Sequence, residues 1–150
     1  MLDDLIKNAA KLMREQTAAY RRLETACNQL SAALVSGKPE TIESLTRAGE
    51  ETLLGMRVRL VQLMTALAAF ADKHPGAEEG ALGPETRIAF RDASDELFRA
   101  ARDFQRAQAR AAAVASNGAA FAAAGIELCG VPPTTYRAPY SRRGEGRAWG

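Results

Sequence analysis

Several residue types are scarce in this chain of 150 residues, and each scarcity excludes a class of protein. Its two cysteines, Cys27 and Cys129, each lie among apolar neighbours, so we expect buried free thiols rather than a disulfide. The one histidine, His74, has no second metal ligand at a useful spacing. We therefore expect neither a disulfide framework nor a metal site.

Catalytic patterns are also missing. The glycines form no phosphate-binding motif, and Cys27 has no histidine nearby in the sequence. Adjacent carboxylates diverge by about 100° on a helix, so they do not converge on one substrate atom. The pairs in question are Asp3/Asp4, Glu50/Glu51 and Glu78/Glu79. We expect no enzymatic activity, no cofactor and no small-molecule substrate.

Long apolar runs are absent as well. The N-terminal stretch "MLDDLIKNAAKLM" begins with acidic residues and has no continuous apolar core, so it does not read as a signal peptide. No uninterrupted run of about 18 apolar residues occurs. The expectation is a cytoplasmic protein without membrane insertion.

What the chain does contain is helical periodicity. Apolar residues recur at steps of three and four over residues 2–35 and again over 39–72, which predicts two long helices. The first stripe comprises Leu2, Leu5, Ile6, Ala9, Leu12, Met13, Ala19, Tyr20, Leu23, Ala26, Cys27, Leu30 and Leu34. The second comprises Ile42, Leu45, Gly49, Leu53, Met56, Leu60, Leu63, Leu67 and Phe70.

A short break separates these helices. In "SGKPE", Gly37 suits a left-handed C-terminal cap, and Pro39 suits the first turn of the next helix. So short a connection predicts an antiparallel hairpin. A second break, residues 72–84, holds five prolines and glycines and reads as a loop.

A third helix is predicted over residues 85–128. Phe90, Leu97, Phe104 and Ala111 recur every seven residues, with Ala93, Ala101 and Gln108 as companions on the same face. The "SNG" at 116–118 either kinks this helix or ends it early.

These elements predict an all-α fold: an up-down-up, three-helix antiparallel coiled-coil bundle over residues 1–130. The first two helices span roughly 50 Å, and the third is longer by roughly 15 Å. If the third helix starts level with the end of the second, its surplus projects past the 36–39 turn. A flexible basic tail, residues 131–150, follows; it carries four arginines and one glutamate, hence a charge of +3.

Two basic features raise the question of nucleic acid. Arg99, Arg102, Arg106 and Arg110 step by three and four along one strip, but acidic residues are interleaved with them. We read the strip as a solvated helix face. The tail adds Tyr136, Tyr140 and Trp149 among arginines, which fits either single-stranded nucleic acid or a peptide that docks into a partner.

The order of the motifs resembles the bacterial flagellar export chaperones of the FlgN type. Three stretches carry the resemblance, and they touch nearly the whole chain. They are the hairpin "ALVSGKPETIESLTRAGEETLLGMRVRLVQL" (33–63), the helix end "ARAAAVASNGAAFAAAGIEL" (109–128) and the tail "TYRAPYSRRGEG" (135–146). The chain departs from the family in its alanine-rich third helix and in lacking a second asparagine shortly before Asn117.

The resemblance implies a cytoplasmic chaperone that holds terminal segments of hook-associated proteins, the hook–filament junction proteins, and delivers them to the export gate or export ATPase. Client contacts are expected from the third helix, and gate docking from Tyr136 or Tyr140. The expected client contacts are Phe104, Val114, Asn117, Phe121, Ile126 and Leu128. The alternatives are a structural coiled coil that self-associates through the third helix, for instance as a homodimer, and, ranked below it, a helical nucleic-acid binder.

Overall fold

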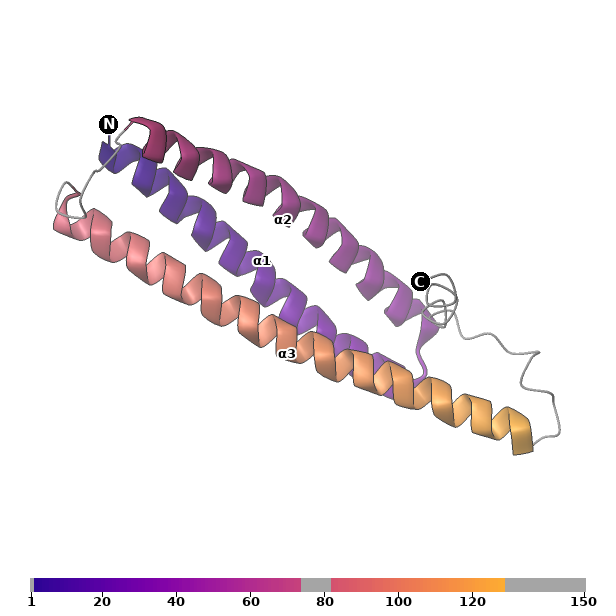
Figure 1. Ribbon diagram of the computed structural model, residues 1–150. Coiled ribbons are helices and arrows are strands. Elements are labelled where there is room, and N and C mark those ends of the chain that lie inside the picture. Colours follow the sequence, from indigo (N-terminus) through magenta and orange to yellow (C-terminus); the bar gives the residue numbers. More distant parts are fainter. Residues whose placement is uncertain (1, 74–81, 129–150) are drawn as a thin grey trace, which may run out of the picture.

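The computed structural model describes residues 2–73 and 82–128, apart from the side chains of residues 121 and 125–128. It contains three helices: α1 (Leu2–Ser36), α2 (Pro39–Lys73) and α3 (Pro84–Leu128). They run up, down and up, with α1 between the other two (Figure 1). The predicted all-α three-helix bundle is confirmed, and every helix boundary lies within one residue of its expected position. The cysteine at 129, the histidine at 74 and the predicted tail lie outside the described residues.

The turn between α1 and α2 has the geometry that its sequence predicts. Gly37 has a φ of 64°, the left-handed conformation that glycine adopts without steric cost. The amide of Lys38 donates to the carbonyl oxygen of Ala33 at 3.1 Å, which closes the end of α1. Pro39 then occupies the first position of α2, where its missing N–H costs no helical hydrogen bond.

Helix α1 packs against α3 through rows of small alanine side chains, and we call this contact the alanine seam. Ala93, Ala100 and Ala107 of α3 are at most 3% exposed, and Ala9 and Ala19 of α1 are buried in the same core. Small side chains let two helix backbones approach closely, so this seam can bury whole faces of both helices. Ala101 and Gln108 were predicted to share the core face of α3, and this prediction is wrong by one residue. Ala101 is only half-buried and Gln108 is exposed, because the seam runs through the residues preceding them, Ala100 and Ala107.

The packing of α1 against α2 is sparser. Only Met56 and Leu63 of α2 are buried. Leu53 and Leu60, predicted to face the core, are instead exposed by 42% and 49%. The reason is that α2 packs mainly on α1, since its backbone approaches α3 only marginally and the two helices meet only through side chains such as those of Leu63 and Ala93. One neighbouring helix covers a narrow strip, and the residues at its edges stay in solvent.

A buried glutamine connects α1 to α2. The Nε2 of Gln16 donates to the backbone carbonyl oxygen of Met56 at 3.2 Å, and its Oε1 accepts a hydrogen bond from the Nε of Arg59, also at 3.2 Å. Gln16 is 7% exposed, yet both ends of its amide are satisfied. A buried polar group with complete hydrogen bonding holds its two helices at one axial position.

Helix α3 extends past the end of the other two helices. Its start is level with the start of α1, where the Gly83 amide donates to the Asp3 carboxylate at 3.4 Å. Further along, Arg21 pairs with Asp103 and Asn28 with Arg110, both at a separation of 82 residues. Ser36, the last residue of α1, is therefore level with residue 118 (36 + 82).

The surplus of α3 is thus residues 119–128, which project beyond the α1–α2 turn as the yellow end of Figure 1. This confirms the predicted level start and the predicted projection. The helix is continuous through Asn117 and Gly118, so the "SNG" sequence does not end it.

Candidate partner-binding surfaces

Among the side chains that the structure describes, the largest group of exposed apolar residues lies on the outward face of α2. We call these six residues the α2 strip: Leu53, Leu54, Val58, Leu60, Val61 and Met64, each between 42% and 64% exposed. They occupy 12 positions of one helix, and no other described helix packs on them. Contiguous apolar surface of this kind on a helix marks a site of interaction.

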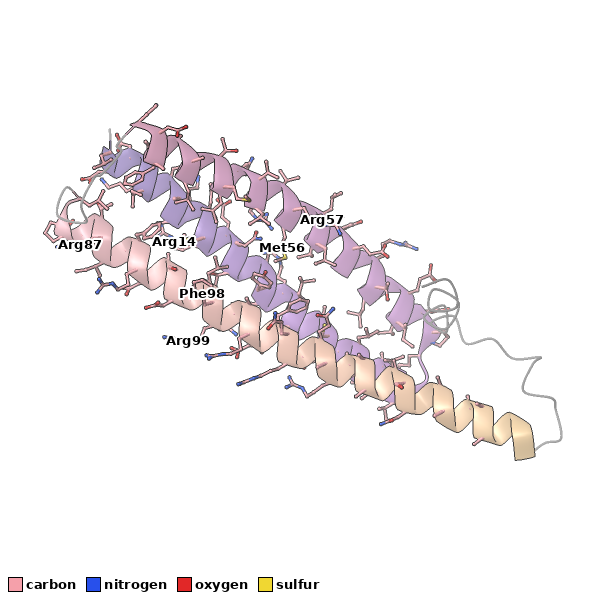
Figure 2. The ribbon with its side chains drawn as sticks, in the orientation of Figure 1. Arg14, Met56, Arg57, Arg87, Phe98 and Arg99 are labelled. Carbon is pink, nitrogen blue, oxygen red and sulfur yellow. The ribbon has the colours of Figure 1, made fainter. Side chains whose placement is uncertain are left out.

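The α2 strip surrounds one arginine. On a helix, the nearest surface neighbours of Arg57 are the residues three and four positions away on either side. Those four residues are Leu53, Leu54, Leu60 and Val61, all of them in the strip. Arg57 itself is exposed and forms no ion pair within residues 2–73 and 82–128 (Figure 2). The strip is therefore an aliphatic ring around one free positive charge.

The size of the α2 strip limits how tightly it can hold a partner. Burying the exposed part of one such side chain contributes on the order of 1 kcal/mol, or about 6 kcal/mol for all six. Association itself costs roughly 4–15 kcal/mol. We therefore expect weak, reversible binding unless the partner adds polar contacts of its own.

A second surface is the projecting end of α3. Val114 is half-buried and lies level with Ala32 of α1, while Asn117 is exposed one turn further along. Phe121, Ile126 and Leu128 belong to the backbone segment beyond the last residue of α1, but their side chains lie outside what the structure describes. The prediction of client contacts at these residues stays a prediction.

Phe104 has a different environment from the rest of that predicted set. Its ring lies 5.7 Å from the ring of Tyr20, centroid to centroid, and it packs against the buried cluster of Ala19, Leu23 and Met56. All three helices contribute to this cluster. The structure thus places Phe104 inside the bundle rather than beside Val114 and Asn117, and its ring already has partners within the chain.

The arginine strip of α3 is exposed, in agreement with its reading as a solvated face. Acidic residues interrupt the positive charge of this strip. Asp103 accepts a hydrogen bond from Arg21 at 2.8 Å, and this guanidinium lowers the pKa of the Asp103 carboxyl. A shallow hollow beside the exposed Phe98 is lined by Asp95 together with Arg99 and Arg102. This mixture of charges is a poor match for a phosphate backbone.

No group of three or more potential metal ligands occurs among the described residues. Cys27 is a half-buried free thiol, and burial raises its pKa, so the reactive thiolate is disfavoured at neutral pH. The parts of the chain that the structure covers thus bring no nucleophile, base and metal ligand together.

The apolar character of helix α2 bears on the expectation of no membrane insertion, which stays a prediction. By length and composition it is apolar enough to cross a bilayer, and only 11% of its most apolar 18-residue window is buried within the protein. The apolar character of α2 does not show as an uninterrupted apolar run, because Arg57 and Arg59 interrupt the sequence. The useful signal was that Leu54, Val58, Val61 and Met64 lie off the predicted core stripe, so that α2 is apolar on more than one face.

Comparison of the chain with protein-family models, with curated proteins and with solved structures finds no match in any of the three sets. The two surfaces, the α2 strip and the end of α3, are consequently interpreted from their own chemistry and from the motifs of the sequence.

Proposed function

We propose that this protein is a chaperone of flagellar type III export. It binds the terminal segments of hook–filament junction proteins in the cytoplasm, prevents their aggregation and delivers them to the export gate. The proposal rests on the order of the three sequence motifs and on one structural observation, the projection of residues 119–128 beyond the α1–α2 turn.

A projecting helix suits this task for a physical reason. Residues beyond the end of α1 have no second helix beside them within the described bundle, so a helical client segment can pack where a bundle neighbour would otherwise lie. A client segment that becomes ordered only on binding loses conformational entropy. This loss offsets part of the favourable contact energy. The resulting modest affinity permits release at the gate.

The direct test is co-expression with a hook-associated protein, followed by affinity purification of the complex. We expect the two proteins to purify together and the Phe121→Asp variant to lose its client. The matched control is Ile88→Asp, which changes an exposed apolar residue near the other end of α3 and should retain the client. Absence of any hook-associated protein from the wild-type purification would rule the proposal out.

Delivery is tested separately. Deleting residues 131–150 removes both candidate gate-docking tyrosines and none of the residues that form the described core. We expect the truncated protein to fold and to bind its client, yet to lower the amount of client exported in a secretion assay. Tyr136→Ala and Tyr140→Ala then identify which ring docks.

Self-association through α3 is the second candidate function, because residues 119–128 project without a neighbouring helix, and the same segment of a second copy could supply one. Sedimentation analysis separates the two functions. A dimer that persists unchanged in the presence of client would favour a structural coiled-coil protein.

A further inference from the structure

The α2 strip lies apart from the surface assigned to the client. In the antiparallel pair α1–α2, Gln16 is level with Met56, and Leu23 lies against Gly49, so residues 53–64 of α2 are level with residues 8–19 of α1. The projecting end of α3 begins 17 residues further along α1, a distance of roughly 25 Å. The strip is therefore a separate surface that requires its own explanation.

Arg57 determines what can cover this surface. Any partner that packs on Leu53, Leu54, Leu60 and Val61 also removes water from the guanidinium that they surround. Desolvating a charge without giving it an ionic or hydrogen-bonding partner is strongly unfavourable. A stable occupant must therefore place a carboxylate over Arg57 while it buries the aliphatic ring.

A second copy of the chain does not meet this requirement. The aliphatic ring is centred on Arg57, so a symmetric pairing that covers the ring on both copies brings the two Arg57 side chains together, in either helix orientation. The nearest acidic residues of α2, Glu51 and Glu50, lie two and three positions outside the strip. Sliding one helix to bring them over Arg57 would uncover Val61 and Met64.

A lipid bilayer does not meet it either. The strip is apolar enough for a membrane surface, but Arg57 lies at the middle of its apolar face rather than at the polar edge where arginine is tolerated. The chemistry instead fits an amphipathic helix, whose apolar residues at three- and four-residue steps pack on aliphatic side chains while a flanking acid reaches the arginine.

We propose that the α2 strip is a docking surface for one amphipathic helix of a partner protein, and that this helix supplies a glutamate or aspartate to Arg57. The surface is distinct from the end of α3, and the inference holds whether or not the partner is a flagellar client.

The test uses the full chain and two designed peptides. Both are fluorescein-labelled, span three heptads and carry leucine at the a and d positions. One has glutamate at the central flanking positions and the other has lysine. We expect fluorescence anisotropy to show about fivefold tighter binding of the glutamate peptide.

Two pairs of variants locate the site. Leu54→Asp should weaken binding of the glutamate peptide by about tenfold, whereas Phe98→Asp, on a similarly exposed apolar residue of α3, should leave binding unchanged. Arg57→Glu should reverse the preference between the peptides. Arg99→Glu changes the net charge by the same amount on α3 and should preserve that preference. Figure 2 shows Arg57, Phe98 and Arg99 on their helices.

Each contrary outcome overturns the proposal. These outcomes are equal affinity for both peptides, no binding of either at about 100 μM, or equal losses in Leu54→Asp and Phe98→Asp. A dimer abolished by Leu54→Asp would assign the strip to a second copy. Sedimentation with vesicles of phosphatidylcholine and phosphatidylglycerol, if abolished by the same change, would assign it to a membrane.

The docking surface on α2 and the chaperone function can be refuted independently. Peptide binding reports on α2 and needs no flagellar protein, while loss of a hook-associated client in Phe121→Asp reports on the end of α3. If Leu54→Asp also releases the hook-associated client, the partner helix of the strip belongs to that client.

Discussion

The two faces that α1 presents are packed in opposite ways. Against α3 it forms a seam of alanines, and against α2 it meets leucine and methionine. Yet α2 buries only two of its 35 residues, whereas α1, of the same length, buries eight. Alanines allow close backbone approach, while the larger side chains of α2 point largely into solvent. Burial here depends on how many neighbours a helix has rather than on how apolar the helix is.

The largest expected effect contrasts two leucines of α2. Leu63 is 8% exposed and lies in the cluster with Met13 and Ala93, whereas Leu54 lies in the exposed strip. Leu63→Ala should lower the free energy of unfolding by about 2–4 kcal/mol through lost contacts and a cavity. Leu54→Ala should change it by less than about 0.5 kcal/mol. Urea denaturation followed by circular dichroism measures both, and equal losses would contradict the assignment of the two faces.

The alanine seam is tested by enlarging it. Ala100 is fully buried, so Ala100→Leu has to push α1 and α3 apart and should cost about 1–3 kcal/mol. Ala113→Leu makes the same change at an exposed position of α3 and should be nearly neutral. Thermal unfolding of the two variants compares them. A neutral Ala100→Leu would mean that the seam is as loosely packed as the face towards α2.

Two glycines sharpen the contrast further. A methyl group at Gly49 would lie 4.0 Å from Leu23 Cδ2, an ordinary contact, so Gly49→Ala should stabilise the protein by about 0.5–1 kcal/mol through helix propensity. At Gly37 the left-handed backbone makes the same substitution unfavourable by about 1 kcal/mol. Opposite shifts in Tm are the expected result. Destabilisation by Gly49→Ala would show that α1 and α2 approach more closely than described.

The smallest effect concerns the ion pair on the α3 side. Because Arg21 lowers the pKa of Asp103 in the folded protein, the pair contributes stability above the ordinary carboxyl pKa of 3.8, and this is lost as pH falls through the lower folded value. The difference in Tm between wild type and Asp103→Asn should thus be small at pH 7 and vanish once the pH has fallen below the lowered pKa of Asp103. Asp92→Asn, on an exposed part of α3, is the control. A difference that persists in acid would mean that the substitution acts through something other than this pair.

The helix boundaries could be predicted from the sequence because local chemistry determines them. Gly37 supplies a left-handed cap, and Pro39 and Pro84 each occupy a first helical position. The buried face of α1 could be predicted equally well, because this helix has a neighbour on two sides. Every residue assigned to its apolar stripe is buried or half-buried.

The sequence could not predict in the same way which residues of α2 and α3 are buried. A three- and four-residue period shows which residues share a face, but the number of helices that cover that face is a tertiary property. Leu60 of α2 follows the period and is exposed because α3 lies too far away to cover it. Phe104 was expected at a partner surface, but the heptad that placed it on one face with Leu97 also directed it towards Tyr20. Gln16 was missed because a glutamine gives no apolar signal, although it is buried.

The hydrogen bonds of Gln16 have a consequence for motion. They join α1 to α2 at Met56 and Arg59, and α2 has no buried residue between Pro39 and that point. We therefore expect residues 39–55 to be held less firmly than residues 56–70, because this segment contacts α1 only through half-buried positions such as Gly49 against Leu23 and through the turn at Gly37. Amides of this segment should exchange with deuterium sooner than those of residues 56–70. Local opening of the bundle would then begin at the α1–α2 turn, which is the end from which α3 projects.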